Sequence, residues 1–201
     1  MKAIVFDVGN VLLRWDPKAI FRAHFDGDES IDAFFSEIGF TEWNLSLDKG
    51  RDLEEAISSL VEAFPKYRHV IPAFRDDWHA SVSGEIRPSV EALSELRAAG
   101  IPTYAITNFS SQRWLECQDR FPFLATHFID AVVSGDEKLV KPSKEIYELF
   151  LSRNKLKADD CLFIDDSAAN VRTASKLGFE TIHFVDDMDL SQHFKRLGLA
   201  A

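Results

Sequence analysis

The chain has 201 residues, of which 46% are hydrophobic and 28% charged, and its formal net charge at pH 7 is -10. This length fits one domain, or one core with a small insertion, and the apolar content excludes an intrinsically disordered chain. The negative charge argues against a nucleic-acid backbone or an anionic membrane surface as the main partner, although a local cluster of donors can still hold a small anion.

The first element of the chain is a short aliphatic run at residues 2–7 that ends in an acid. Asp7 closes the run, and Gly9 and Asn10 follow it. Short continuous apolar runs bounded by turn residues are typical of strands buried on both faces. The sequence therefore predicts a buried strand whose carboxyl end presents one carboxylate on a turn.

The N-terminus and the cysteines indicate the cellular setting. The apolar run meets Asp7 too early for a signal peptide or a membrane span. Cys117 and Cys161 are too few for a disulfide framework, and Cys161 lies in the strand-like stretch CLFIDD, which favours a buried thiol. We expect a cytoplasmic protein without disulfides and without a membrane partner.

Residues 16–85 contain helical patterns and no strand pattern. Four segments show apolar residues at helical spacing: 17–25, 29–39, 53–64 and 70–80. We expect an all-helical cap domain over residues 16–85, inserted into a core domain formed by residues 1–15 and 86–201. The aromatic residues of this cap, including Trp43, are predicted to fill its own core. Because ligands bind at the carboxyl ends of strands in open α/β sheets, the cap is placed to act as a lid.

From residue 86 onward, helix and strand patterns alternate. Helices are expected at 88–100, 110–121, 143–154, 167–178 and 189–197, and strands at 101–107, 128–134, 160–165 and 180–185. Such alternation is typical of a parallel sheet covered by helices. The predicted fold is α/β, with a Rossmann-like parallel sheet, helices on both of its faces and the small helical cap inserted after the first strand.

Polar side chains follow four of the predicted strands. In chain order they are Asp7, then Thr107 and Asn108, then Lys141, and finally Asp165, Asp166 and Asn170. Because the carboxyl ends of parallel strands share one edge of a sheet, we expect these groups to converge on one crevice. Carboxylates suit Mg²⁺, whereas a lysine with hydroxyl and amide donors suits phosphate oxygens. The sequence therefore predicts a site for a hard cation and a phosphoryl group.

The segments FDVGN, AITNFS, GDEKLVKPS and FIDDSAAN resemble, in order and spacing, the four motifs of the haloacid dehalogenase-like (HAD) hydrolase superfamily. The resemblance covers nearly the whole chain, and the predicted cap matches the small cap that follows the first motif in that family. It implies a Mg²⁺-dependent phosphatase that hydrolyses a small phosphorylated metabolite through an aspartyl-phosphate. The DxGN form resembles a branch with sugar-phosphate phosphatases, including ones that act on glucose 1-phosphate.

The resemblance also implies roles for the residues that bind and attack the phosphoryl group. Asp7 resembles the nucleophile, and Thr107 the hydroxyl that binds the transferring group, with the Asn108 amide as a second donor. Lys141, which precedes a proline as in the family motif, resembles the lysine that neutralises the nucleophile and the phosphate. Lys138 is a nearby rival for that role.

The metal ligands implied by the resemblance are Asp7, the Gly9 carbonyl and Asp166. Asp165 is either a further ligand or a residue that supports the ligands, and Asn170 either touches the site or makes a local hydrogen bond. Most phosphatases of the family carry a second Asp at the position of Gly9, and it serves as the general acid. Such a group contributes roughly 10²–10⁴-fold in rate. Three explanations are open for its absence here. A cap residue or the substrate itself supplies the proton, the leaving group is good enough to need little help, or the enzyme has moved away from phosphatase chemistry.

Two other functions compete with the phosphatase. A metal-free 2-haloacid dehalogenase needs no acid at Gly9, but three carboxylates that meet without a cation would repel one another. A non-catalytic binding protein of the same fold would have no need for Asp7, Lys141 and Asp166 together. Arg14, Trp15, Asn44 and His79 are candidate substrate contacts in or near the cap. The chain is expected to be a monomer or a homodimer.

Overall fold

The computed structural model describes residues 3–185 and 188–199. Its main sheet has five strands in the order β5-β4-β1-β6-β7, and every neighbouring pair is parallel. The strands are β1 (Ala3–Phe6), β4 (Thr103–Thr107), β5 (Ala131–Val133), β6 (Cys161–Asp165) and β7 (Glu180–His183). The predicted Rossmann-like sheet is therefore confirmed. Residues 1–2, 186–187 and 200–201, which the predicted core includes, lie outside the described residues.

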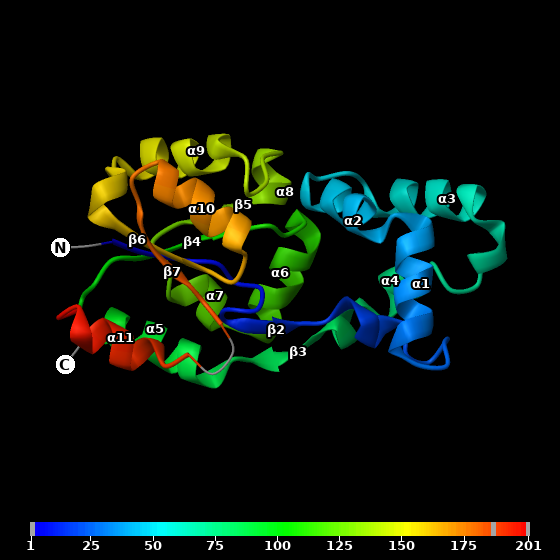
Figure 1. Ribbon diagram of the computed structural model, residues 1–201, viewed down its shortest axis with the longest axis horizontal. Helices are drawn as coiled ribbons and strands as arrows, with labels where there is room; N and C mark the ends of the chain where they lie inside the picture. The colour runs from blue at the N-terminus through cyan, green and yellow to red at the C-terminus, as the bar shows by residue number, and fades with distance from the viewer. Residues whose placement is uncertain (1–2, 186–187, 200–201) are drawn as a thin grey trace.

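Helices cover both faces of this sheet. The helices are α5 (Arg87–Ala98), α6 (Ser111–Arg120), α7 (Phe123–Thr126), α8 (Ser134–Glu137), α9 (Lys144–Asn154), α10 (Ala168–Lys176) and α11 (Leu190–Arg196). In Figure 1, α9 and α10 lie on one side of the sheet, and α5 and α11 lie on the other. Five of these helices confirm the predicted ones, whereas α7 and α8 are single turns that the sequence did not indicate.

The first strand explains why the aliphatic run is continuous. Ile4 and Phe6 pack into the hydrophobic cluster that contains α5 and α11, whereas Val5 packs into the cluster that contains α9 and α10. Successive side chains of a strand point to opposite faces, so a strand covered on both faces needs an apolar residue at every position. The central position of β1 in the sheet therefore follows directly from its composition.

The segment predicted as a cap, residues 16–85 (here called the insertion), lies beside the core in Figure 1, and strands β2 (Leu13–Trp15) and β3 (Val82–Glu85) connect the two. Its helices are α1 (Asp28–Ile38), α2 (Phe40–Asp48), α3 (Leu53–Ala63) and α4 (Ala73–Asp76), and its 3-10 turns are Pro17–Ile20, Pro65–Tyr67 and Trp78–Ser81. The expectation of no strand between 16 and 85 is wrong at β3. This strand forms by antiparallel pairing with β2, and only Val82 of its four residues is buried, so it has no apolar pattern of its own.

The helical prediction at 17–25 is also only partly right. A 3-10 turn forms at Pro17–Ile20, where the Asp16 side chain accepts a hydrogen bond from the Lys18 amide, and the chain then continues as turns. At 70–80 the structure has the short α4 and another 3-10 turn in place of one helix. Helix α2 was not predicted. It follows α1 directly through Gly39, whose φ of +65° lets the chain change direction between the two helices.

Aromatic side chains form the interior of the insertion, as predicted. The Phe34 ring lies 5.2 Å from the Phe21 ring and 4.7 Å from the Tyr67 ring, measured between centroids. Trp43 packs against Phe74 with 4.8 Å between ring centroids, and its indole N–H donates to the Ala56 carbonyl at 3.1 Å. These rings supply the buried area that a helical unit of this size needs.

Two further expectations can be compared with the described residues. No helix among residues 3–185 and 188–199 combines the length and the apolar character that a membrane crossing requires. Cys117 and Cys161 are both buried and both free of disulfide bonds, and Cys161 starts β6, which lies next to the central strand β1. The buried thiol predicted for Cys161 is therefore confirmed, and Cys117 is buried as well.

Candidate active site

The carboxyl end of β1 places Asp7 at the edge of the sheet. The Asp7 amide donates to the Ile164 carbonyl of β6 at 2.8 Å, so the backbone still follows the sheet at this point. The chain then turns, and Asn10 adopts a left-handed conformation with φ of +53°. The Val8 amide donates to Asp7 Oδ1 at 2.7 Å, which fixes the carboxylate on the turn.

Lys141 joins the first and fourth motifs through two buried ion pairs. Its Nζ lies 2.8 Å from Asp7 Oδ1 and 2.7 Å from Asp165 Oδ2, and only 1% of its side chain is exposed. Burial disfavours the ammonium, but the carboxylates of Asp165 and Asp7 outweigh it and raise the pKa of Lys141 above its ordinary value. Lys138 donates instead to the Gly135 carbonyl at 2.7 Å. Of the two lysines, it is Lys141 that meets the carboxylates.

Asn108 positions Lys141 through its backbone. The Asn108 amide nitrogen donates to the Lys141 carbonyl at 3.0 Å, and the Lys141 amide donates to Asn108 Oδ1 at 2.8 Å. Both polar atoms of this side chain thus hold the loop that carries the lysine. Thr107 ends β4 and is 1% exposed. Within the described part of the chain it does not line the cavity, whereas Asn108 does.

Asp165 is fully buried and engaged on both of its oxygens. Oδ1 accepts from the Ser167 amide at 2.8 Å, and Oδ2 accepts from Lys141 Nζ at 2.7 Å. Asn170, one turn along α10, donates to both oxygens at 3.0 and 3.1 Å. These contacts saturate the Asp165 carboxylate. Asn170 makes the expected local hydrogen bond and also lines the cavity, so its two expected uses do not exclude each other.

Asp166 completes a group of three acids whose ligand atoms, one each from Asp7, Asp165 and Asp166, all lie within 4.8 Å of one another. Burial, together with the Asp165 carboxylate, raises the pKa of Asp166. Burial also raises the pKa of Asp7 to about 8, opposed by Lys141 and reinforced by Asp165 and Asp166. Three acids thus face a single ammonium, and a divalent cation bound by hard oxygen ligands would relieve this imbalance. The donor set fits Mg²⁺.

A cavity of about 820 Å³ lies over these groups, between the core and the insertion. Asp7, Gly9, Asn108, Lys141 and Asp166 line its polar end. The opposite wall is mostly apolar and comes from the insertion, with Phe35, Phe40, Leu45, Leu53, Phe74 and Trp78 among the lining residues. The edge of the sheet therefore supplies the acids and the lysine of the reacting centre, and the inserted segment supplies an apolar wall together with charged residues such as Asp48 and Arg51.

The four candidate substrate contacts divide into two pairs. Trp15 and Asn44 line the cavity, whereas Arg14 and His79 are not among its described lining residues. Arg14 pairs with Gly84 in the β2–β3 ribbon. The His79 carbonyl accepts from Arg120 of α6 at 3.2 Å, so this residue helps to join the insertion to the core.

Sequence reasoning missed several charged residues of the cavity, among them Asp48 and Arg113. Asp48 ends α2, and burial raises its pKa to about 7 against the opposing charge of Lys141. Arg113 is buried in α6, where it donates to the Arg75 carbonyl at 3.0 Å and stacks over Trp78 at 4.9 Å. Neither residue lies in a recognisable motif, so only the packing of the insertion on the core indicates them.

Comparison with known proteins gives matches that span the chain. The family model described as haloacid dehalogenase-like hydrolase matches residues 1–178. The sesquiterpene phosphatase astK of Aspergillus oryzae is 24% identical over 203 residues, which cover 98% of this chain and 96% of that protein. Bifunctional epoxide hydrolase 2 of Rattus norvegicus is 30% identical over 103 residues, but these are 48% of this chain and only 18% of that protein.

Solved structures show the same fold. The HAD family enzyme bt-2542 of Bacteroides thetaiotaomicron superimposes with a TM-score of 0.80 at 23% identity, covering 96% of this chain and 98% of the other. A structure of the same enzyme in complex with magnesium and inorganic phosphate matches with a TM-score of 0.75 at 22% identity, over 96% and 99% of the two chains. From the match over residues 1–178, the chain belongs to the haloacid dehalogenase-like hydrolase family.

Proposed function

We propose that this hydrolase is a Mg²⁺-dependent phosphatase that acts on a small phosphorylated metabolite through an aspartyl-phosphate intermediate. The observation that carries the proposal is the grouping of Asp7, Lys141 and Asp165 in direct contact, with Asp166 completing an acidic set within 4.8 Å. A nucleophilic carboxylate, a buried cation beside it and hard oxygen ligands are the parts that phosphoryl transfer to an aspartate requires.

Asp7 is the proposed nucleophile. Its Oδ1 accepts from Val8 and Lys141, and these two contacts orient the carboxylate so that Oδ2 is the oxygen available to phosphorus. Lys141 keeps the nucleophile anionic and balances charge on the phosphoryl oxygens. Asp165 and Asn108 hold Lys141 by its side chain and by its backbone. Thr107 stays the proposed hydroxyl donor to the phosphoryl group.

Asp7, the Gly9 carbonyl and Asp166 are the proposed Mg²⁺ ligands. When bound, the ion would neutralise the acids and polarise the phosphoryl group. Asp165 is less suited to direct ligation, because Ser167, Asn170 and Lys141 already engage its oxygens. We assign it to positioning Lys141. The structure of bt-2542 in complex with magnesium and inorganic phosphate supports the proposal of a magnesium-dependent enzyme.

A metal-free dehalogenase fits these residues less well. A carboxylate that attacks carbon needs no cation, yet this site brings together three acids and raises the pKa of Asp7 to about 8 mainly through burial. Without a cation, only the buried ammonium of Lys141 would offset the repulsion among the three carboxylates. A protein that only binds a ligand would gain nothing from three acids placed so close together. Both alternatives therefore rank below phosphoryl transfer.

The insertion, residues 16–85, is the proposed cap domain over a core of residues 1–15 and 86–201. Its apolar wall bears on the substrate class. A sugar phosphate would need several polar partners in the cavity, and Asn44 and Asp48 are two that the insertion offers. The rings of Phe35, Phe40 and Phe74 favour instead a phosphate ester with an apolar body. The phosphatase astK, whose name gives a sesquiterpene as its substrate class, supports this second candidate.

The direct test is hydrolysis of p-nitrophenyl phosphate with Mg²⁺ and with EDTA. We expect phosphate release that depends on the metal. A panel of sugar phosphates and apolar alkyl phosphates then separates the two substrate classes by kcat/KM. Metal-indifferent release of halide from a 2-haloacid, without any phosphate release, would replace the proposal with dehalogenation.

A further inference from the structure

We infer that the Asp48 carboxyl, carried by helix α2 of the insertion, is the general acid and base of the reaction, in the role that Gly9 has no side chain to perform. The inference rests on the proposed phosphatase function and deepens it. It assigns a catalytic residue to the insertion, whose other cavity residues are mainly apolar.

The position of Asp48 is suited to this role. It is the last residue of α2 and lines the same cavity as Asp7 and Lys141, on the wall contributed by the insertion. Asn44, one turn earlier in α2, donates to Asp48 Oδ2 at 3.2 Å. This hydrogen bond orients the carboxyl, so that Oδ1 is the oxygen free to exchange a proton with a bound ester. A general acid needs this kind of fixed approach to the leaving oxygen.

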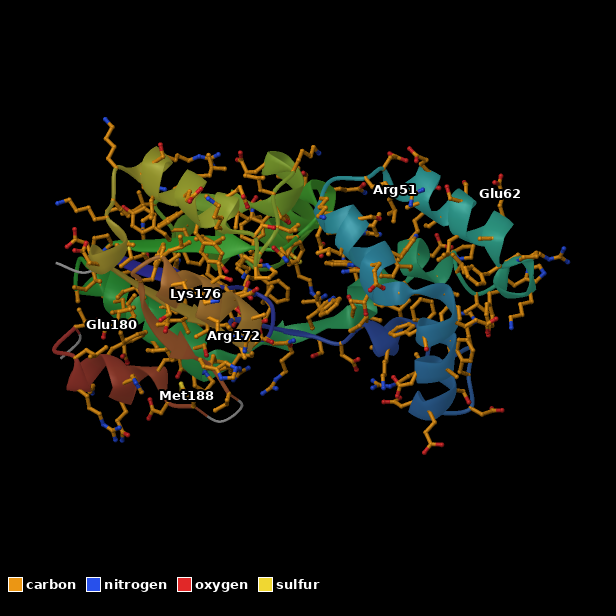
Figure 2. The ribbon with its side chains drawn as sticks, turned by 45° about the horizontal axis from the view of Figure 1, so that its top comes forward. Arg51, Glu62, Arg172, Lys176, Glu180 and Met188 are labelled. Carbon is orange, nitrogen blue, oxygen red and sulfur yellow. The ribbon has the colours of Figure 1, made fainter. Side chains whose placement is uncertain are left out.

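The turn after α2 packs against the core and thereby holds Asp48 at the cavity. Gly50 has a φ of +81°, and a Cβ at this position would lie 2.0 Å from Lys138 Nζ and 2.7 Å from the Gly135 carbonyl. Helix α2 also contacts α8, which contains Gly135. In Figure 2, Arg51 lies at the end of the insertion that faces the core, whereas Glu62 lies at its far end. The Asp48 backbone is thus held only two residues from a direct contact with the core.

The electrostatic setting of Asp48 suits proton transfer near neutral pH. Burial raises its pKa to about 7, and Lys141 opposes that shift. An acid with this pKa is present in both protonation states at neutral pH and can donate and then accept. The charged groups that share the cavity with it are the acids Asp7, Asp16, Asp52 and Asp166 and the cations Lys18, Arg51, Arg113, Lys138 and Lys141.

Asp48 donates the proton that the first half-reaction needs and accepts the proton that the second half-reaction releases. In the first, an Asp7 oxygen bonds to phosphorus while the ester P–O bond breaks, and the Asp48 proton passes to the departing oxygen, which leaves as a neutral alcohol. In the second, the Asp48 carboxylate takes a proton from water as the water oxygen bonds to phosphorus. The Asp7–phosphorus bond then breaks, which releases phosphate and restores both carboxyl groups.

The test compares two leaving groups in the full-length Asp48→Asn variant with Mg²⁺ present. p-Nitrophenolate leaves without a proton, whereas an alkoxide does not. We expect kcat/KM for an alkyl phosphate such as hexyl phosphate to fall roughly 10²–10⁴-fold, with p-nitrophenyl phosphate turnover nearly unchanged. Asp189→Asn is the control, because Asp189 is exposed, is not among the described lining residues of the cavity, and an Asn there still caps α11. It should leave both substrates near wild type.

Two further measurements separate a proton-transfer role from a structural one. With the alkyl ester, wild-type kcat/KM should decline as pH rises through about 7, because only the protonated Asp48 can donate, and this decline should vanish in Asp48→Asn. Gly9→Asp in the Asp48→Asn background should restore part of the alkyl ester activity, since a Cβ at Gly9 meets no atom within 4 Å.

Equal losses for both esters in Asp48→Asn, or an unchanged pH profile, would overturn the assignment. These outcomes differ from failure of the proposed function itself, in which the wild-type protein would show no metal-dependent turnover of p-nitrophenyl phosphate. If Asp48→Asn does not fold, Asp48→Glu serves in its place. This variant should keep part of the alkyl ester activity with its pH dependence, and a pH-independent loss shared by both esters would again refute the role.

Discussion

The core and the insertion differ in where their ion pairs lie: the core holds a buried set, and the insertion pairs its charges on the surface. In the core, Lys141 and Asp165 are almost completely buried and pair within 2.7 Å, and Asn170 adds two hydrogen bonds to the carboxylate. In the insertion, ion pairs such as Lys66 with Glu37 and Arg75 with Glu54 have both side chains more than 40% exposed. The buried set fixes geometry for chemistry, whereas exposed pairs contribute little to stability because solvent screens them.

This contrast indicates that the core and the insertion have different roles in the reaction. The core offers charged groups held by strands and by reciprocal hydrogen bonds, so their positions vary little with the substrate. The insertion lines the cavity with aromatic and aliphatic side chains and with charged residues such as Asp48. It contacts the core where α2 meets α8 and where Arg120 of α6 donates to the His79 carbonyl. Changes in the core are therefore expected to abolish the reaction, and changes in the insertion to alter which esters react.

The largest expected effect is that of Asp7→Asn in the core. An amide cannot form the phosphoryl intermediate, so turnover of p-nitrophenyl phosphate should fall about 10³-fold or more. The fold should survive, because one of three crowded acids is removed. Thermal unfolding of the variant checks this second point, and residual metal-dependent activity near the wild-type level would refute Asp7 as the nucleophile.

Lys141→Met should come next, since it affects both activity and stability. The variant leaves Asp7 and Asp165 buried without their cation, and breaking a buried pair in this way costs about 3–5 kcal/mol. Urea unfolding in EDTA measures the loss, and p-nitrophenyl phosphate hydrolysis measures the drop in turnover.

The control for that variant is Lys144→Met. Lys144 pairs with Glu148 along α9 and is 61% exposed, so its removal should change stability by less than about 0.5 kcal/mol. Equal losses of stability for the two lysines would mean that the buried pairs contribute no more than a surface pair.

Asp166→Asn tests the metal side of the core. Removing a charged ligand that is only partly buried should raise the Mg²⁺ concentration needed for half-maximal turnover by roughly 10–100-fold, with less effect at saturating metal. Titration calorimetry with Mg²⁺ alone gives a second readout. Asp160→Asn, an exposed acid just before β6, is the control and should bind Mg²⁺ like the wild type.

The smallest effect is expected in the insertion, at Gly50→Ala. The added methyl group would meet the Gly135 carbonyl and Lys138, so the turn after α2 should shift and lower kcat/KM for alkyl phosphates by about tenfold. Gly100→Ala imposes the same positive-φ strain of roughly 1 kcal/mol at a position where nothing lies within 4 Å. A matching loss of activity in that control would attribute the effect to strain alone.

Much of the site could be predicted from the sequence, because each motif lies at the end of a strand. Asp7, Asp165 and Lys141 meet as expected, since parallel strands and the loops after them bring their polar ends to one edge. The role of Asn108 in holding the Lys141 backbone could not be predicted in this way. Its side chain holds the Lys141 backbone across 33 positions of sequence, and a pattern within one motif carries no information about such a partner.

The sequence by itself determined the parallel sheet, the helices of the core and the residues that form its charged centre. Those features depend on local periodicity and on the fact that strand ends must share an edge. Only the tertiary structure decided the pairing of β2 with β3, the saturation of Asp165 and the placement of Asp48 in the same cavity as Lys141. These depend on how the insertion packs against the core, and contacts between distant segments leave no periodic trace in the chain.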